Sequence, residues 1–226
     1  MRRLLALVAL TTGLASGAVA RTSHAEGWRP PGDRQTLPAL PLRVVFTEVH
    51  DAPVRDEAWF GKQLAEARRL FADAGICFDR ARTGYLGPEF ANVEGRAGVQ
   101  RFDAERDPGF INVFVVASIE GLPLWNHTGE AWGVTHTTRF VLLSARADST
   151  AVLAHELGHY FGLSHSERSG DPMKPNGPPP VRFDELELLQ IRHTAFGQLG
   201  QGALTPRPRV ESECPAPSPE IVFDHR

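Results

Sequence analysis

Residues 155–165 read HELGHYFGLSH, and this stretch decides how the rest of the chain is interpreted. It lies in a segment whose apolar residues recur at helical spacing. In a helix, positions i and i+4 share a face, so the side chains of His155 and His159 can point at one ion. Because imidazole is a common metal ligand, the sequence predicts a metal site on this helix.

A catalytic zinc ion needs a third protein ligand and an open coordination position. Gly162 follows the helix and permits a sharp change in chain direction, which would bring His165 round to the same ion. Glu156 is expected to act as a general base, because zinc lowers the pKa of a water that a nearby carboxylate can deprotonate. Chance would give the eleven-residue pattern in roughly one sequence of this length in ten thousand.

The stretch fits the H-E-x-x-H-x-x-G-x-x-H signature and resembles the metzincin zinc peptidases. Ser166 follows the third histidine, as it does in matrixins, and Met173 stands eight residues after His165 with Pro175 just beyond it. This spacing is similar to that of the matrixin Met-turn. The resemblance implies that Met173 forms an apolar floor under the metal. It is specific over residues 155–175 and weaker over 42–199.

The chain also departs from the matrixin pattern. Lys174 stands where matrixins commonly have Tyr, and no Tyr lies two residues after Met173, so a fifth ligand of the astacin kind is not expected. No segment similar to the matrixin calcium and structural-zinc region precedes the helix, which leaves calcium binding open. Residues 21–41 contain no cysteine switch. Residues 110–116 also resemble pappalysin-type peptidases, so the resemblance leaves the metzincin subfamily open.

The first twenty residues have the features of an export signal. Arg2 and Arg3 precede an apolar run at residues 4–10, and a small-x-small pattern ends at Ala20. We therefore expect a signal peptide cleaved near Ala20 and a secreted protein, either extracellular or periplasmic. The apolar run is too short for a stable membrane span, and no other stretch is long and apolar enough.

Two cysteines, Cys77 and Cys214, remain in the chain. In an oxidising compartment a cysteine pair tends to be bridged, so we favour a disulfide that ties the C-terminal segment to the domain. The alternative is two unpaired thiols, one of them buried in a strand.

The chain is expected to divide into a signal peptide at 1–20, a Pro/Gly-rich linker at 21–41, a metalloprotease domain at 42–199 and a Pro-rich tail at 200–226. Its predicted elements alternate in type, which indicates an α+β (mixed α/β) fold with helices packed on one twisted sheet. The resemblance adds that this sheet is mostly parallel and that a small C-terminal subdomain holds the Met-turn and one helix. Strands are expected at 42–49, 76–81, 110–119, 131–136 and 140–144, helices at 56–74, 149–161 and 183–196, and loops at 83–109, 121–129 and 169–180.

The formal net charge of -3 gives no basic field for nucleic acid. We expect a secreted zinc metalloendopeptidase that binds one catalytic zinc ion, acts on protein or peptide, and is assumed to be a monomer. The alternative is a secreted zinc-containing binding or adhesion module without turnover. The intact Glu156 argues against that alternative, whereas the absence of a prodomain argues slightly for it.

Further residues could contribute to the site. His127 and His136 flank residues 125–132 and could form a second metal site or line the cleft, although loop histidines are more often simply solvated; Glu130 has the same status. By resemblance, the region 131–144 would pair with extended substrate, and the loop at 174–180 would shape the pocket beyond the scissile bond.

Overall fold

The computed structural model describes residues 37–122, 131–136, 139–175 and 177–215. Its elements occur in the following order: β1 (Leu40–Val49), β2 (Ala52–Pro53), α1 (Glu57–Phe71), β3 (Phe78–Leu86), β4 (Asn92–Glu94), α2 (Gly95–Gln100), β5 (Ile111–Val116), β6 (Ser118–Glu120), β7 (Gly133–His136), β8 (Phe140–Ser144), α3 (Val152–Tyr160) and α4 (Glu185–Gly200). Short 3-10 turns follow α1 at Ala72–Ala74, precede β4 at Pro88–Phe90, follow α2 at Arg101–Asp103 and lie near the C-terminus at Glu211–Glu213.

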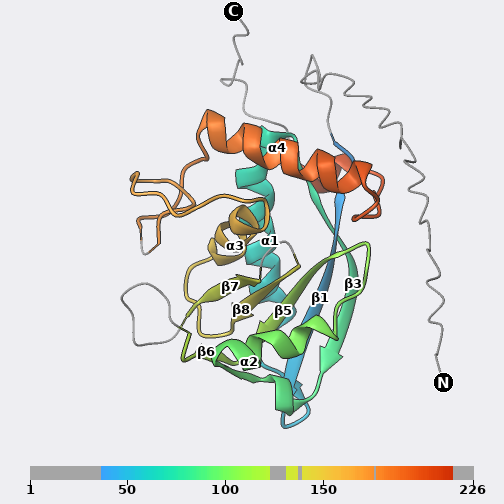
Figure 1. The fold of residues 1–226 in the computed structure, drawn as a ribbon, viewed down its shortest axis with the longest axis vertical. Helices are drawn as coiled ribbons and strands as arrows, with labels where there is room; N and C mark the ends of the chain where they lie inside the picture. Colours follow the sequence, from blue (N-terminus) through green and yellow to red (C-terminus); the bar gives the residue numbers. More distant parts are fainter. Residues whose placement is uncertain (1–36, 123–130, 137–138, 176, 216–226) are drawn as a thin grey trace, which may run out of the picture. The chain divides into compact units, whose positions relative to one another are not determined.

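One mostly parallel sheet organises the domain (Figure 1). Strand β1 pairs in parallel with both β3 and β5, and β5 pairs in parallel with β8. Strand β7, which lies at the edge of the sheet beside β8, is antiparallel to β8. The short β2 is antiparallel to the end of β1. The expected α+β fold with a mostly parallel sheet is therefore confirmed.

The central strands are buried on both faces, and their side chains alternate between two cores. One core takes Leu42 and Val44 from β1 together with residues of α1, α3 and α4. The other takes Val45 from β1 together with Phe102 and residues of the small β4–β6 sheet. Because successive side chains of a strand point to opposite faces, one strand can serve both cores. The sheet thus holds α1 and α3 on one face and α2 on the other (Figure 1).

The expectation of a long loop at 83–109 is wrong. Strand β3 continues to Leu86, and β4, α2 and 3-10 turns follow it. The end of β3 is only half-buried or exposed, so it carries no continuous apolar run. Helix α2 has six residues, too few to show a helical period, and it is held through Val99 and the following Phe102.

Helix α1 begins and ends close to the predicted positions. The side chain of Asp56 accepts a hydrogen bond from the backbone N–H of Trp59 at 2.7 Å, as an N-cap should. Gly75, with φ of 71°, closes the 3-10 turn after the helix. Helix α4 begins at a capping box formed by Asp184 and Glu187, and it ends at Gly200 instead of near residue 196.

Helix α3 begins later than the predicted residue 149, and its capping residue is Ala151, whose side chain makes no capping bond. The cap comes instead from α1. The Oε1 atom of Gln63 accepts from the backbone N–H of Leu153 at 3.1 Å, and its Nε2 donates to the carbonyl of Ser149 at 2.7 Å. Gln63 is 1% exposed, so its amide joins two helices inside the core.

Replacing this amide tests its role. We expect Gln63→Leu to lower the free energy of unfolding by about 1–3 kcal/mol, because the N–H of Leu153 would lose its acceptor in a buried position. Urea unfolding at neutral pH measures the change. Lys62→Leu introduces the same side chain at the neighbouring exposed position and should leave stability nearly unchanged. Equal stability of the two variants would show that the amide contributes nothing.

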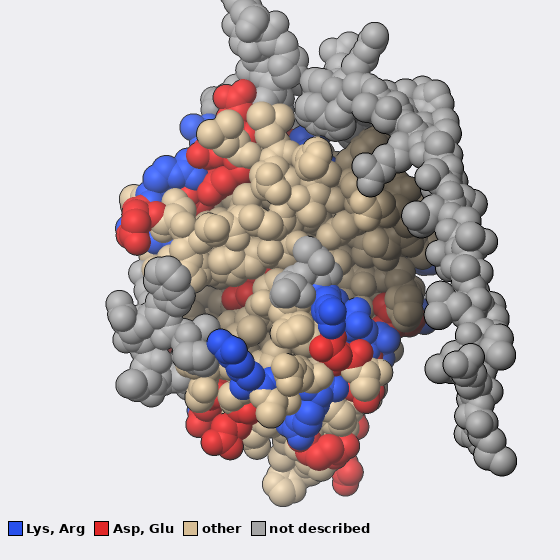
Figure 2. All heavy atoms as spheres, viewed as in Figure 1, with Lys and Arg blue, Asp and Glu red and all other residues tan. Residues whose placement is uncertain are grey.

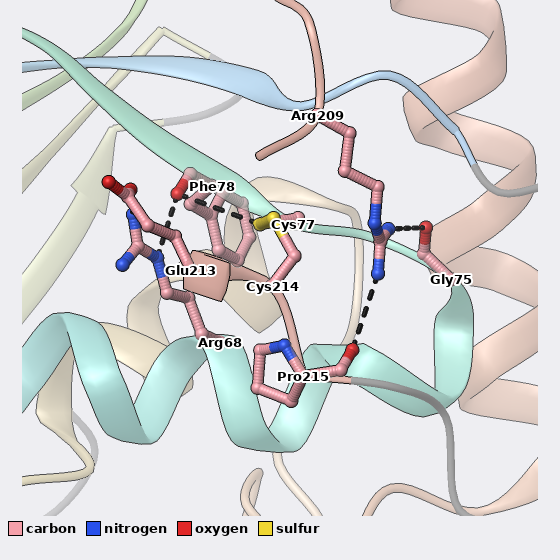
Figure 3. The surroundings of a disulfide bond; sticks show 8 residues. All are labelled: Arg68, Gly75, Cys77, Phe78, Arg209, Glu213, Cys214 and Pro215. Carbon is pink, nitrogen blue, oxygen red and sulfur yellow. Dashed lines mark hydrogen bonds and ion pairs between the residues drawn. A yellow bond between two sulfur atoms is a disulfide. The ribbon is translucent and has the colours of Figure 1, made fainter. Parts of the chain in front are cut away.

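The described part of the Pro-rich C-terminal segment returns to the start of the domain. Ala39 and Arg207 exchange two backbone hydrogen bonds of 3.0 Å. Cys77 and Cys214 form a disulfide with a Cα–Cα distance of 5.5 Å. Figure 3 shows Arg209 beside this bond, where it donates to the carbonyls of Gly75 and Pro215. This segment is therefore attached to the domain by both covalent and hydrogen bonds.

The disulfide closes a loop with a sequence separation of 137 residues. Loss of such a bond is expected to lower the free energy of unfolding by about 2–4 kcal/mol, chiefly because the unfolded chain gains freedom. Urea unfolding with and without reductant measures this effect. The double variant Cys77→Ser, Cys214→Ser serves as the control, since it should be insensitive to reductant. A wild-type midpoint that does not move on verified reduction would contradict the expectation.

Candidate metal centre

The three motif histidines converge on one point. His155 and His159 lie on α3, and His165 follows the turn at the end of that helix. One candidate ligand atom from each ring lies within 4.8 Å of the others. His155 and His159 are half-buried, whereas His165 is exposed. The chain has therefore assembled three imidazoles in a group that could hold one metal ion.

Main-chain carbonyls orient two of these rings. Nδ1 of His155 lies 2.8 Å from the carbonyl oxygen of Pro172, and Nδ1 of His159 lies 2.8 Å from that of Leu163. In these pairs the Nδ1–H donates, which leaves each Nε2 with a lone pair for a metal.

Burial lowers the pKa of His155 to about 4 and also lowers that of His159, so both rings are neutral at pH 7. Neutral, oriented imidazoles are the donors that zinc prefers, so this donor set fits a zinc ion.

Gly162 shapes the path to His165. Its φ is +93°, a conformation that favours glycine. The backbone N–H of Gly162 donates to the carbonyl of His159 at 2.9 Å, and that of Leu163 donates to the carbonyl of Gly158 at 3.0 Å. These bonds end the helix and turn the chain. The structure thus places Gly162 at the bend that the sequence analysis assigned to it.

Glu156 lies on the same helix and is 5% exposed. Oγ1 of Thr135, in β7, lies 2.7 Å from Oε2 of Glu156 and 2.7 Å from its main-chain oxygen. Burial raises the pKa of Glu156 to about 7, although the hydrogen bond from Thr135 acts in the opposite direction. A carboxyl group with a pKa near neutrality can both take up and release a proton at neutral pH.

Strand β7 approaches Glu156 closely at Gly133. A Cβ atom added there would lie 2.6 Å from both Cγ and Oε1 of Glu156. Neither Gly133 nor Thr135 was singled out from the sequence. No spacing rule links them to the motif, because their relation to Glu156 arises only when β7 packs on α3.

Met173 lies beneath α3 and is fully buried. A Cβ atom added at Gly158 would come within 2.2 Å of the Met173 Sδ, so the thioether fits directly against the helix backbone. The backbone N–H of Ser166 donates to the carbonyl of Met173 at 3.0 Å, which joins the turn to the segment after His165. This position agrees with an apolar floor under the histidines.

We expect Gly158→Ala to lower the free energy of unfolding by about 1–3 kcal/mol, because the new methyl group displaces Met173 in a packed core. Zinc affinity should fall with it, since the same contact supports the histidine pair. Thermal unfolding and chelator competition measure the two effects. Gly61→Ala is the matched control, because a Cβ at this glycine of α1 meets nothing within 4 Å. A Gly158→Ala protein as stable as the control would contradict the packing argument.

Of the remaining candidates, the structure describes His136. His136 is half-buried in β7, where it stacks on Phe140 with 5.0 Å between the ring centroids, and it is not among the three converging ligands. His127 and Glu130 lie outside the described residues, as does position 176 in the loop at 174–180.

The family model for Matrixin matches residues 61–188, which include β7, β8, the histidine helix and the Met-turn. The chain belongs to the matrixin family. Of the two resemblances, matrixin-like and pappalysin-like, the match supports the first. The protein is accordingly a metzincin-type zinc metalloprotease, a hydrolase whose substrates are proteins or peptides. Among curated proteins, none has a significant sequence match to this chain.

Solved structures share the fold of this matrixin at low sequence identity. Archaemetzincin from Methanopyrus kandleri aligns with a TM-score of 0.50 and 13% identity, covering 74% of this chain and 99% of its own. Metalloproteinase-II from Bacteroides fragilis aligns with a TM-score of 0.50 and 12% identity, covering 73% of this chain and 55% of its own. These likenesses support the metzincin-like arrangement of sheet and helices.

Proposed function

We propose that the protein is a secreted zinc endopeptidase in which His155, His159 and His165 hold the metal and Glu156 is the catalytic base. The observation that carries this proposal is the convergence of three imidazoles, two of them oriented through Nδ1, beside a buried carboxyl group. When bound, zinc supplies Lewis acidity, which polarises a carbonyl and lowers the pKa of water. The protein's own side chains hold the metal in place and transfer the proton.

Glu156 is suited to move a proton in both directions. Thr135 engages Oε2 at 2.7 Å, and a carboxyl group held in this way can accept a proton from water and later pass it to the leaving amine. The raised pKa, about 7, brings the carboxyl group close to the pH at which both transfers are needed. A Cβ atom at Gly133 would lie 2.6 Å from this side chain, so a glycine at this position is what lets β7 lie against the carboxyl group.

Strand β7 is suited to hold an extended substrate. It forms one end of the main sheet and pairs antiparallel with β8. Thr135 on this strand contacts Glu156, so a peptide added along β7 would lie beside the catalytic residues. The face around α3 and β7 carries few charged side chains (Figure 2), which suits a peptide recognised mainly through its backbone.

Secretion is supported by the Cys77–Cys214 disulfide, because such bonds persist in oxidising compartments. Residues 1–20, which carry the expected signal peptide, lie outside the described residues. Within the described residues, no helix is both long enough and apolar enough to cross a membrane. N-terminal sequencing of the exported protein tests the expected cleavage after Ala20.

Metal analysis tests the site itself. We expect one zinc ion per chain, loss of peptide hydrolysis on chelation, and recovery when zinc is restored. Zinc bound at one equivalent without any hydrolysis would support the alternative of a binding module. Hydrolysis that persists after complete metal removal would contradict the zinc mechanism.

A further inference from the structure

Arg168 connects the two segments that support the histidines. It lies in the loop between His165 and the Met-turn, and its guanidinium contacts three carboxylates. Its Nη2 lies 2.5 Å from Oδ2 of Asp171 and 2.7 Å from Oε2 of Glu187, and its Nη1 lies 2.5 Å from Oδ2 of Asp184. Asp171 belongs to the Met-turn, whereas Asp184 and Glu187 begin α4. One side chain therefore bridges the Met-turn and the start of that helix.

Each of these carboxylates also accepts a hydrogen bond from a backbone N–H group. Oδ1 of Asp171 accepts from the N–H of Met173 at 2.8 Å. Oδ1 of Asp184 accepts from the N–H of Glu187 at 2.7 Å, and Oε2 of Glu187 accepts from the N–H of Asp184 at 2.8 Å. The backbone hydrogen bonds and the ion pairs to Arg168 together orient the three carboxylates, and a planar, multidentate guanidinium is the cation that matches them.

The ion pairs of Arg168 are connected to the metal site through Pro172, the neighbour of Asp171. Pro172 follows Asp171, and its carbonyl oxygen accepts from Nδ1 of His155 at 2.8 Å. Met173 comes next and packs against Gly158, between the two helical histidines. A displacement of Asp171 would therefore move both the acceptor that orients His155 and the floor beneath the helix.

Charge makes Arg168 necessary for this arrangement. The side chain of Asp171 is only 2% exposed and that of Glu187 is 14% exposed. The side chains of Arg168 and Asp184 are 48% and 36% exposed, so solvent reaches one side of the cluster and weakens these ion pairs. Without the guanidinium, the buried carboxylate of Asp171 would still lose its cation while it faces two other acids. Figure 2 shows acidic and basic side chains gathered at the upper left, over the loop between α3 and α4, whereas the middle of this face is mostly uncharged.

We propose that Arg168 is a positioning residue, which fixes the Met-turn against α4 and thereby holds His155 in its metal-binding orientation. This inference rests on the proposed zinc site. It does not require turnover, because the effect of Arg168 is already present when zinc binds. Lysine cannot replace it fully, since one ammonium group cannot span three carboxylates on two segments.

The test uses the full exported protein and zinc itself as the probe. Arg168→Met removes the charge and keeps the aliphatic stem. We expect it to lower zinc affinity, measured by chelator competition, by about 10–100-fold, as losses of outer-shell partners do. The visible spectrum of the cobalt-substituted protein should also change, because His155 would be reoriented. Arg168→Lys should lie between wild type and Arg168→Met in both readouts, and it provides the test if Arg168→Met fails to fold.

The control is Arg82→Met, because Arg82 makes an exposed ion pair with Asp107 far along the chain from the motif. It should leave zinc affinity and the cobalt spectrum unchanged. If Arg168→Met or Arg168→Lys lowers only the thermal stability of the metal-free protein, Arg168 is merely structural and the inference is overturned. Wild-type protein that binds zinc but cleaves no peptide would overturn the endopeptidase proposal alone. Wild-type protein that binds no zinc would overturn both.

Discussion

Glu156→Gln is expected to lower kcat for peptide hydrolysis by about 10²–10⁴-fold, the range supplied by a positioned general base. Glutamine keeps the shape of the side chain and can still meet Thr135, but it cannot take up a proton. Zinc content should stay at the wild-type level, because Glu156 is not one of the three converging ligands. Steady-state kinetics on a fluorogenic peptide, with metal analysis of the same samples, measures both quantities.

The matched control for this variant is Glu185→Gln, an exposed glutamate at the start of α4. It should retain wild-type kcat and KM. If Glu156→Gln retained wild-type kcat with zinc bound, Glu156 would not be the base, even though its pKa is raised to about 7. If the variant instead lost zinc, the carboxyl group would have a role in holding the site together that the geometry does not predict.

His159→Ala is expected to have the second large effect, the loss of tight zinc binding. The ring centroid of His159 lies 4.8 Å from that of His155 and 4.7 Å from that of His165, so this imidazole contacts both of the other candidate ligands. Its removal leaves two imidazoles where a catalytic zinc site needs three protein ligands. We expect zinc affinity to fall by more than about 100-fold, the upper end of the range for outer-shell partners. Chelator competition measures the change.

Peptide hydrolysis by His159→Ala should fall in parallel and recover partly when zinc is added in excess. His193→Ala is the control, because His193 is an exposed histidine of α4 outside the ligand group. A His159→Ala protein that retained wild-type zinc affinity would mean that the metal is held elsewhere.

The candidate site could be predicted from the sequence because it is local. The eleven motif residues and Met173 lie within one short stretch, and helical periodicity alone places two of the histidines on one face. The glycine at 162 adopts the positive φ that its residue type suggested. The sheet strands with continuous apolar runs, such as β5 and β8, were also found, because both of their faces are buried.

The features that escaped prediction depend on contacts between distant segments. Gln63 caps α3 from 90 residues away, and Thr135 reaches Glu156 of α3 from strand β7. The predicted strand at 76–81 ends before β3 does, because the second half of β3 lies at the sheet edge, where apolar residues are not required. Arg168 resembled any loop arginine in the sequence, since its three acidic partners meet only in the folded chain.

Cleavage of an unbiased peptide library by the zinc-loaded wild-type protein tests the central claim most directly. Mass spectrometry of the products would be compared between wild type, wild type after chelation, and zinc-loaded Glu156→Gln. The account predicts internal peptide-bond cleavage by the zinc-loaded wild type and its loss in the other two samples. Equal cleavage in all three samples, or none by the zinc-loaded wild type, would contradict it.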